Sequence, residues 1–244
     1  MKIKDKIEII DLALKLDKIL IFADFHVGYE EALNKQGVLV PRFQFKDTME
    51  RLDKIFENIE GKEIETIIVN GDLKHEFGTI SETEWRQALK IFDYLAERCK
   101  KMILIKGNHD KILGPIAEKR NLEIAEFVVI DDVLICHGDK IDSDLENAIE
   151  NKNIKTIIIG HEHPAVTLRE SAEAVRSEKY KCYLVGKYKG KILIVQPSFN
   201  LVTEGTDVAK ERLLSPFLKQ DLSKFSVFVV ADKVYEFGKI KNLE

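Results

Sequence analysis

The sequence predicts an α/β protein with two packed β-sheets and helices on the outside. In the first half of the 244 residues, short β-branched runs alternate with longer amphipathic stretches, whereas the second half consists mostly of strand-like runs. No internal repeat, low-complexity tract or linker rich in Pro, Gly or Ser interrupts this pattern. We therefore expect a single domain that spans residues 1–244.

The strand candidates are short runs rich in Ile and Val, and each is followed by a small polar loop. In chain order they are Lys18–Ala23, Thr66–Asn70, Lys101–Lys106, Glu126–Ile130, Val133–Cys136, Thr156–Ile159, Tyr180–Val185, Lys191–Gln196, Val227–Ala231 and Val234–Phe237. Gly186 and Gly190 predict a hairpin turn between the candidates Tyr180–Val185 and Lys191–Gln196.

The helix candidates are longer stretches in which apolar residues recur at helical spacing. They are Gln44–Asn58, Glu82–Arg98, Pro115–Asn121 and Asp142–Asn151. Ser81 with Glu84 forms a plausible capping box at the start of the second candidate. The segment from Gly28 to Pro41 has no such pattern, and we expect it to be a loop over the functional site.

The composition indicates a soluble protein of the cytoplasm. Hydrophobic residues make up 45% of the chain and charged residues 33%. The longest apolar runs, such as Ile19–Ala23, are far short of the roughly 20 residues that a membrane span needs. Charged residues interrupt the first apolar stretch, which argues against a secretory signal. The three cysteines are odd in number and widely spaced, as in a reducing compartment.

Five polar loops that directly follow predicted strands carry side chains that commonly bind metals. They are Asp24-Phe25-His26, Gly71-Asp72-Leu73-Lys74-His75, Gly107-Asn108-His109-Asp110, His137-Gly138 and Gly160-His161-Glu162-His163. The chain has six histidines, and every one lies in these loops. A rigid sheet holds such side chains while they reach into a loop-lined cleft. In the first and last loops the candidate ligands are two residues apart, which in an extended segment places both on one face.

Each loop taken alone has an ordinary structural explanation. A Gly-Asn-His-Asp sequence suits a turn with a capping side chain, and His137 alone could be a satisfied structural histidine. Asp110 either orients His109 or caps the following turn, and the sequence leaves both open. Asp139 fits a turn, and Cys136 fits a buried core thiol that points away from His137. The concentration of all histidines in five ordered loops nevertheless favours a metal site.

The order of these motifs resembles that of the calcineurin-like metallophosphoesterase superfamily over residues 18–163. The resemblance implies a four-layer αββα sandwich of two mixed β-sheets flanked by helices, with two metal ions at the strand ends. By motif match, the implied ligands of the first metal are Asp24, His26, Asp72 and His163. The implied ligands of the second are Asp72, Asn108, His137 and His161. Asp72 would bridge the two ions, and His109 would face the substrate.

The chemistry of this donor set agrees with phosphoester hydrolysis. Two cations about 3.5–4 Å apart clamp the attacking and leaving oxygens of an in-line displacement at phosphorus, and a bound water becomes hydroxide near neutral pH. Imidazole, carboxylate and amide donors without thiolate favour Mn²⁺, Fe²⁺, Zn²⁺ or Ni²⁺ over Mg²⁺ or Ca²⁺, and Mn²⁺ is our first choice. A protonated His109 could stabilise the developing charge or protonate the leaving oxygen.

His75 bears on the substrate. Many phosphatases of this superfamily have an Asp at the third position after the bridging Asp, whereas this chain has His75. A Gly-Asp-Leu-x-His motif is similar to that of the SbcD-type DNA nucleases, and later stretches such as Gln196–Asn200 resemble SbcD-related archaeal and bacterial PdeM phosphoesterases. His75 could therefore orient a phosphodiester or its leaving group, the alternative being an ordinary surface-loop histidine.

The stretch 169–191 is basic, with seven Lys or Arg, three Glu and three interleaved Tyr in a chain of net charge −4. Such a stretch could bind single-stranded nucleic acid, although a solvated hairpin whose lysines point to water is the favoured explanation. We expect a metal-dependent phosphodiesterase acting on DNA or another nucleic acid. The alternatives are a phosphodiesterase or pyrophosphatase for a nucleotide or other small molecule, and a non-catalytic scaffold. No membrane partner is expected.

Overall fold

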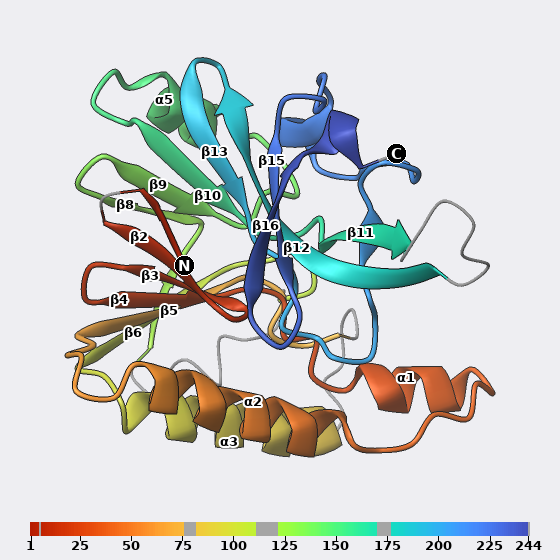
Figure 1. Cartoon of the computed structure of the whole chain (residues 1–244). Helices are drawn as coiled ribbons and strands as arrows, with labels where there is room; N and C mark the ends of the chain where they lie inside the picture. The colour runs from red at the N-terminus through yellow and green to blue at the C-terminus, as the bar shows by residue number, and fades with distance from the viewer. Residues whose placement is uncertain (5, 76–81, 111–121, 170–176, 244) are drawn as a thin grey trace. The chain divides into compact units, whose positions relative to one another are not determined.

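The computed structural model describes residues 1–4, 6–75, 82–110, 122–169 and 177–243. The chain forms two compact units. The first unit comprises Met1–Glu126 and Phe199–Thr203, and the second comprises Phe127–Ser198 and Glu204–Glu244 (Figure 1). Each unit contains one β-sheet with both parallel and antiparallel neighbours, which confirms the predicted α/β class with two mixed sheets. The prediction of a single domain is not tested by this division and stays a prediction.

The sheet of the first unit has its seven strands in sequence order. They are β1 (Lys2–Lys4), β2 (Ile7–Ile10), β3 (Ala13–Leu16), β4 (Ile19–Phe22), β5 (Thr66–Asn70), β6 (Lys101–Ile105) and β7 (Glu123–Ala125). Strands β1 to β4 form an antiparallel meander, whereas β4 to β7 are parallel. Parallel neighbours end at the same edge of a sheet, so the loops after β4, β5 and β6 emerge together.

Three α-helices belong to the described part of the first unit, namely α1 (Tyr29–Lys35), α2 (Gln44–Asn58) and α3 (Glu82–Ala96). Helices α2 and α3 lie side by side along the sheet (Figure 1). The ring of Phe56 in α2 lies 6.5 Å from that of Phe22 in β4 and 5.9 Å from that of Tyr94 in α3. These contacts bury the apolar stripe that the sequence showed at helical spacing, and they attach both helices to the parallel strands.

The second unit is built on a nine-stranded sheet. Its strands are β8 (Phe127–Ile130), β9 (Val133–Cys136), β10 (Thr156–Ile159), β11 (Pro164–Arg169), β12 (Ser177–Tyr188), β13 (Lys191–Val195), β14 (Thr206–Asp207), β15 (Ser226–Val230) and β16 (Val234–Lys239). Strand β10 is parallel to both of its neighbours, β9 and β13. Helix α5 (Ser143–Glu150) and the 3-10 helices η1 (Pro216–Leu218) and η2 (Ile240–Asn242) complete the unit.

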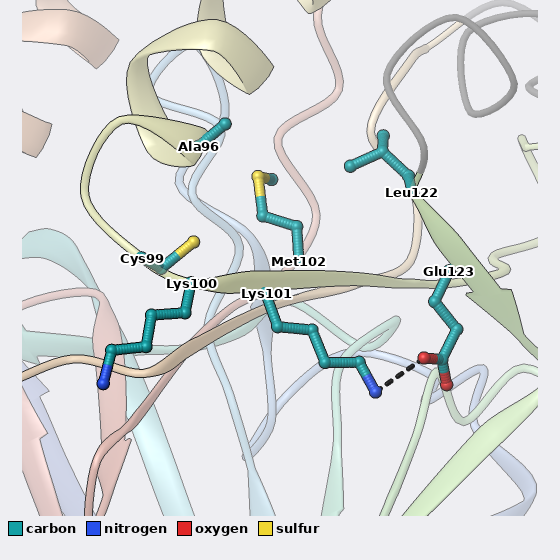
Figure 2. Close-up of a pocket in the computed structure, with 7 residues that line it drawn as sticks. All are labelled: Ala96, Cys99, Lys100, Lys101, Met102, Leu122 and Glu123. Atoms are coloured by element: carbon teal, nitrogen blue, oxygen red, sulfur yellow. Dashed lines mark ion pairs between the residues drawn. The ribbon is translucent and has the colours of Figure 1, made fainter.

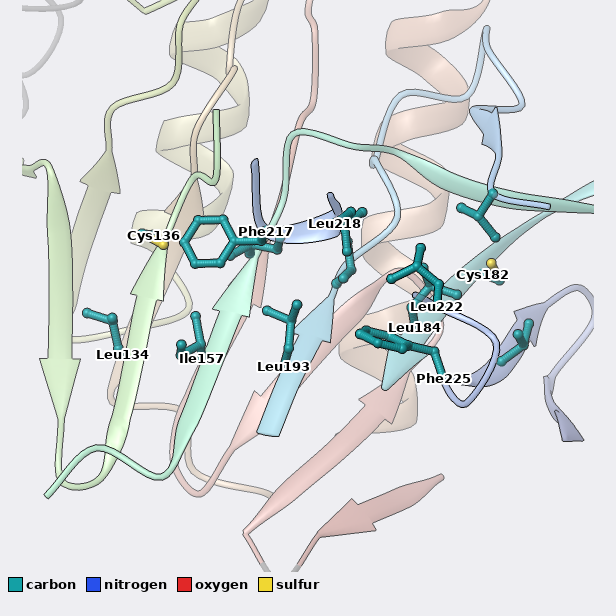
Figure 3. Close-up of a cluster of buried hydrophobic side chains, with 14 of the residues drawn as sticks. Leu134, Cys136, Ile157, Cys182, Leu184, Leu193, Phe217, Leu218, Leu222 and Phe225 are labelled. Carbon is teal, nitrogen blue, oxygen red and sulfur yellow. The ribbon is translucent and has the colours of Figure 1, made fainter. Parts of the chain in front are cut away.

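One face of this second sheet carries a hydrophobic core of alternate strand residues, as in Leu134 and Cys136 of β9 (Figure 3). Phe217 of η1 and Leu222 pack against that face. Because burial raises the pKa of the Cys136 thiol, this residue stays protonated and acts as a small apolar side chain, as predicted.

The segment 199–203 returns to the first unit after the chain has built β8 to β13. Phe199 N donates to Ala23 O at 2.8 Å, and Asn200 N donates to Asp24 O at 3.1 Å. The Phe199 ring packs 4.8 Å from that of Phe25 and 5.4 Å from that of Phe22. The loop after β4 is therefore fixed by a part of the chain far away in sequence.

Most predicted elements are confirmed, and α2, β5, β9 and β10 have the predicted bounds. The expectation of a loop over Gly28 to Pro41 was wrong in part, because α1 occupies Tyr29–Lys35. Strands β1, β2, β3, β7, β11 and β14 were not predicted. The predicted helix Pro115–Asn121 and the capping residue Ser81 lie outside the described residues.

Among the described helices, none has both the length and the apolar character that crossing a membrane requires. The three cysteines, Cys99, Cys136 and Cys182, are all free thiols.

Gly186 in β12 provides a test of the packing in the second unit. A Cβ atom at this position would lie 2.4 Å from ring carbons of Phe225, so Gly186→Ala overpacks the core. We expect a loss of about 1–3 kcal/mol in the free energy of unfolding, measured by urea denaturation. In the double variant Gly186→Ala with Phe225→Leu the loss should be smaller than the sum of the single effects. Additive effects would contradict the contact.

Candidate metal centre

Three loops of the first unit bring predicted site residues to one edge of its sheet. Asp24 and His26 follow β4, Asp72 and His75 follow β5, and the 107–110 loop with Asn108 and His109 follows β6. Because β4, β5 and β6 are parallel neighbours in matched register, their following loops are adjacent. The structure thus places three of the five predicted loops at one edge of the first unit's sheet.

Backbone hydrogen bonds join the first two of these loops beyond the ends of their strands. His26 N donates to Asp72 O at 2.9 Å, and Val27 N donates to Leu73 O at 2.8 Å. His75 N in turn donates to Val27 O at 3.0 Å. The pairing of β4 with β5 thus continues through the candidate ligands, so the ligand positions are set by backbone geometry.

The candidate ligands share an unusual backbone conformation. The φ angle is 55° at Asp24, 45° at His26 and 46° at Asp72, and in the second unit it is 65° at His161 and 51° at His163. Outside glycine this left-handed region is uncommon and costs about 1–3 kcal/mol per residue, and such residues concentrate at functional sites. The expectation of extended segments at these two-residue spacings was therefore wrong.

Asp72 is a buried carboxylate in the loop after β5. Its side chain is 2% exposed, and its Oδ1 accepts a hydrogen bond from His109 N at 2.9 Å. Its Oδ2 lies 3.7 Å from His26 Nε2 and 3.9 Å from His109 Nε2. A Cβ atom on Gly107 would lie 2.1 Å from Asp72 Oδ1, which explains why glycine stands at that position.

Asp110 holds the 107–110 loop against the loop after β5. Its Oδ1 accepts from Leu73 N and its Oδ2 accepts from Gly107 N, both at 3.1 Å. These bonds stabilise the loop itself, which is neither of the two roles left open by the sequence; the turn that would follow Asp110 lies outside the described residues. His109 has a different neighbour at its Nδ1 atom, the carbonyl oxygen of His75.

That contact determines the tautomer of His109. A carbonyl oxygen only accepts hydrogen bonds, so Nδ1 must carry a proton and donate. The neutral ring then has its lone pair at Nε2, on the side of Asp72. His109 is therefore oriented for proton transfer through Nε2 by a backbone group.

His75 is half-buried, and its ring packs against two other rings. Its ring stacks on that of His109 at 5.5 Å and meets the edge of the Tyr29 ring at 4.3 Å. His26, His75 and His109 each have one ring nitrogen within 4.8 Å of a ring nitrogen of the other two. This packing argues against the alternative of an ordinary surface-loop histidine.

The second unit contributes the other three histidines. His137 follows β9, and His161 and His163 follow β10, the parallel neighbour of β9. Gly160 N donates to His137 O at 2.9 Å, and the rings of His137 and His161 lie 5.0 Å apart. These loops form a second cluster of imidazoles at one edge of the sheet.

Two residues that sequence reasoning did not assign hold this second cluster in place. Glu162 is buried, and its Oε2 accepts from Leu214 N and Ser215 N at 2.8 Å each. Gly205, with a φ of 103°, allows the close approach of its backbone to His163 O, where a Cβ atom would lie at 2.1 Å. Burial raises the pKa of Glu162, partly offset by these backbone donors. The only hint in the sequence to the role of Glu162 was its position between the candidate ligands His161 and His163.

The donor types fit divalent transition metals. The first unit presents two carboxylates, an imidazole and an amide (Asp24, Asp72, His26 and Asn108), and the second presents three imidazoles. Asp24 is 0% exposed, and a buried carboxylate next to buried imidazoles is stabilised by a cation. Thiolate is absent from the set, because Cys136 and Cys182 are buried in the core of the second unit.

Two other features of the described residues do not resemble an active site. A cavity of about 520 Å³ borders the start of β6, the opposite end from the 107–110 loop, and the Lys101–Glu123 ion pair lies at its wall (Figure 2). In the 169–191 stretch, several lysines have partners within the second unit: Lys179 contacts Glu211, Lys189 contacts Glu146 and Lys181 donates to Ser198. Residues 170–176 of this stretch lie outside the described residues.

A model of the calcineurin-like phosphoesterase family matches residues 17–186 of the 244 residues. No curated protein matches the chain. Among solved structures, the nuclease MPE of Pseudomonas putida is similar over 94% of this chain and 93% of its own, with a TM-score of 0.63 and 17% identity. Yfce, a phosphoesterase from E. coli, is similar over 93% of this chain and 94% of its own, with a TM-score of 0.40 and 11% identity. The first likeness supports the fold, and the second is too distant to support an argument.

The contact between Gly107 and Asp72 predicts a specific loss. In Gly107→Ala the new Cβ atom must displace the Asp72 carboxylate, so the metal content of purified protein should fall by at least half, measured by elemental analysis. Gly61→Ala is the matched control, because no atom lies within 4 Å of its Cβ position and its φ is also positive. It should cost about 1 kcal/mol of stability and leave the metal content unchanged. Equal metal content in both variants would contradict the role of this contact.

Glu162 provides a second prediction. Glu162→Ala leaves the N–H groups of Leu214 and Ser215 buried without their acceptor, which should cost about 2–4 kcal/mol in the free energy of unfolding. Glu162→Gln keeps an acceptor oxygen and should cost less than half as much. Urea denaturation of metal-free protein measures both values, and equal losses in the two variants would contradict the assigned role.

Proposed function

The chain belongs to the calcineurin-like phosphoesterase family, and on that premise we propose that it is a phosphodiesterase that hydrolyses nucleic acid with two divalent metal ions. Membership of the family makes it a metal-dependent hydrolase of phosphoric esters. The number of ions, the diester preference and the nucleic-acid substrate are our proposal.

The observation that carries the proposal is the strained backbone at the candidate ligands. Asp24, His26, Asp72, His161 and His163 all have left-handed φ angles, in loops that backbone hydrogen bonds hold rigidly. We assign Asp24, His26, Asp72 and His163 to one ion. We assign Asp72, Asn108, His137 and His161 to the other. Binding energy from the ions would offset the conformational cost of these loops.

The proposed ions are Mn²⁺ by first choice, with Fe²⁺, Zn²⁺ or Ni²⁺ as alternatives, because the donors are nitrogen and oxygen atoms only. When bound, such a pair supplies Lewis acidity at phosphorus and lowers the pKa of water. Asp72, whose two oxygens face different neighbours, is suited to bridging.

His109 and His75 are the proposed catalytic residues of the chain itself. With its Nδ1 proton directed at the His75 carbonyl, His109 uses Nε2 to donate a proton to the leaving oxygen when protonated. His75, whose ring stacks on His109, would hold that ring in position and stabilise the leaving group. Asp110 acts on both only as a positioning residue, through its bonds to Leu73 and Gly107.

Two considerations support nucleic acid as the substrate. His75 stands in the Gly-Asp-Leu-x-His sequence that resembles the motif of DNA nucleases. The structurally similar protein of Pseudomonas putida is a nuclease, which agrees with this substrate class. A nucleotide or another small diester is the alternative that the assays below distinguish.

The assignment of His109 predicts a separation of metal binding from catalysis. His109→Ala should retain the wild-type metal content and lose about 10²–10⁴-fold in kcat on bis(p-nitrophenyl) phosphate with Mn²⁺. Asp72→Asn should lose metal as well as activity, because it removes the proposed bridging charge. Elemental analysis and steady-state kinetics measure the two properties. Unchanged turnover by His109→Ala would refute its catalytic role.

The substrate class is tested by comparing single- and double-stranded DNA, cyclic nucleotides, bis(p-nitrophenyl) phosphate and its monoester. We expect hydrolysis of DNA, with a kcat/KM that falls steeply as salt rises, because binding releases counterions. The small diester should show little salt dependence. Hydrolysis of small diesters without any effect on DNA would overturn the nucleic-acid proposal and favour the small-molecule alternative.

A further inference from the structure

A basic segment without acidic residues joins α1 to the first turn of α2. Residues 35–46 contain Lys35, Arg42 and Lys46 but no Asp or Glu, in a chain of net charge −4. We call these residues the 35–46 segment. Lys46 lies 3.6 Å from Glu50 in the next turn of α2, so Lys35 and Arg42 carry the positive charge of the segment. This charge suits a polyanionic ligand.

The same segment exposes large apolar side chains. Leu39 is 90% exposed, Phe43 60% and Val38 50%. They are three of the seven large hydrophobic side chains exposed in the described part of the chain, and the other four are scattered. Apolar side chains gathered in this way commonly mark a binding surface.

The exposure is a property of an ordered loop. Helix α1 ends in a left-handed turn at Gly37, with a φ of 87°, and Val38 N donates to Leu33 O at 3.0 Å. The Asn34 amide then donates to Glu30 O at 2.8 Å and to Val40 O at 3.1 Å, which ties the loop back to the helix. The loop thus presents Val38 and Leu39 outward while its backbone is held.

Hydrogen bonds connect this segment with the candidate metal centre inside the first unit. The buried Glu30 carboxylate accepts from Phe43 N at 2.8 Å and from Gln44 N at 2.5 Å. The Gln44 side chain donates to His26 O at 3.2 Å. Phe43 is therefore next in sequence to a residue that touches the backbone of a proposed metal ligand.

We propose that the 35–46 segment binds the nucleotides that flank the cleaved phosphodiester, with Phe43 stacking on a base and Arg42 contacting a backbone phosphate. This inference rests on the proposed function and names the residues that would select a polymeric substrate. The Phe43 ring can stack on any base, and the Arg42 guanidinium can neutralise any phosphate. The expected substrate is therefore single-stranded nucleic acid without sequence preference. Leu39 and Val38 would provide apolar contact beside the stacked base.

Binding is measured with the Mn²⁺-loaded His109→Ala protein and a fluorescent single-stranded oligothymidylate, by anisotropy. Phe43→Ala should raise Kd about 10-fold, and Phe43→Trp should restore the parent affinity because stacking returns. Phe43→Leu keeps apolar bulk without a ring and should resemble Phe43→Ala. An abasic oligonucleotide of the same length should bind the parent and Phe43→Ala proteins equally.

Arg42→Ala should lower the slope of log K against log salt by about one, as expected for the loss of one phosphate contact. Lys54→Ala, which removes an exposed cation of α2, and Phe237→Ala, which removes an exposed aromatic ring of β16, are the matched controls. Both should leave affinity within about twofold of the parent. Because all these side chains are exposed, the variants should keep the parent's circular dichroism and unfolding midpoint.

Three outcomes would overturn the inference. The first is unchanged affinity in Phe43→Ala, and the second is full affinity in Phe43→Leu. The third is that Phe43→Ala alters the molecular mass of the protein in solution and leaves its affinity for the oligonucleotide unchanged. The last would identify the segment as a self-association surface. Failure of this inference is distinguishable from failure of the proposed function. If the wild-type protein cleaves DNA and Phe43→Ala cleaves it equally well, only the segment is refuted, whereas inactivity of the wild type on DNA refutes the substrate class.

Discussion

The backbone pairing between residues 24–27 and 71–75 is the constraint on which the candidate metal ligands of the first unit depend. Where β4 and β5 end, their hydrogen bonds continue through His26 and Asp72 even though both residues have left-handed φ angles. A left-handed residue costs roughly 1–2 kcal/mol, and the paired loops with the core behind them over-determine the conformation. The side chains are therefore directed before any ion arrives, which reduces the reorganisation that binding would otherwise require.

The two units position their candidate ligands by different means. In the first, the carboxylate of Asp110 and the N–H of His109 tie the loop after β6 to the loop after β5. In the second, Glu162 reaches across to Leu214 and Ser215, and Gly205 lets the chain pass close to His163. In both units the orienting groups are largely backbone donors and acceptors. This explains how short, polar loops can remain rigid without a hydrophobic core of their own.

The sequence was informative where a pattern repeats along the chain. The amphipathic period of α2 and the β-branched runs of β5, β9 and β10 specified these elements with their bounds. The six histidines similarly revealed the site loops. The sequence was uninformative where structure depends on distant partners: Glu162 acts through residues more than 50 positions away, and α1 is a short helix bounded by two left-handed glycines that read as a loop. The left-handed backbone at the ligands also left no pattern, because Asp and His tolerate it without requiring it.

The return of residues 199–203 to the first unit has a consequence for the order in which the protein can mature on the ribosome. The aromatic cluster of Phe22, Phe25 and Phe199, and the hydrogen bonds to Ala23 and Asp24, are completed only after strands β8 to β13 have been synthesised. Until then the nascent loop at Asp24 lacks its closing partner. The loop that carries Asp24 can therefore reach its final conformation only after most of the polypeptide has emerged.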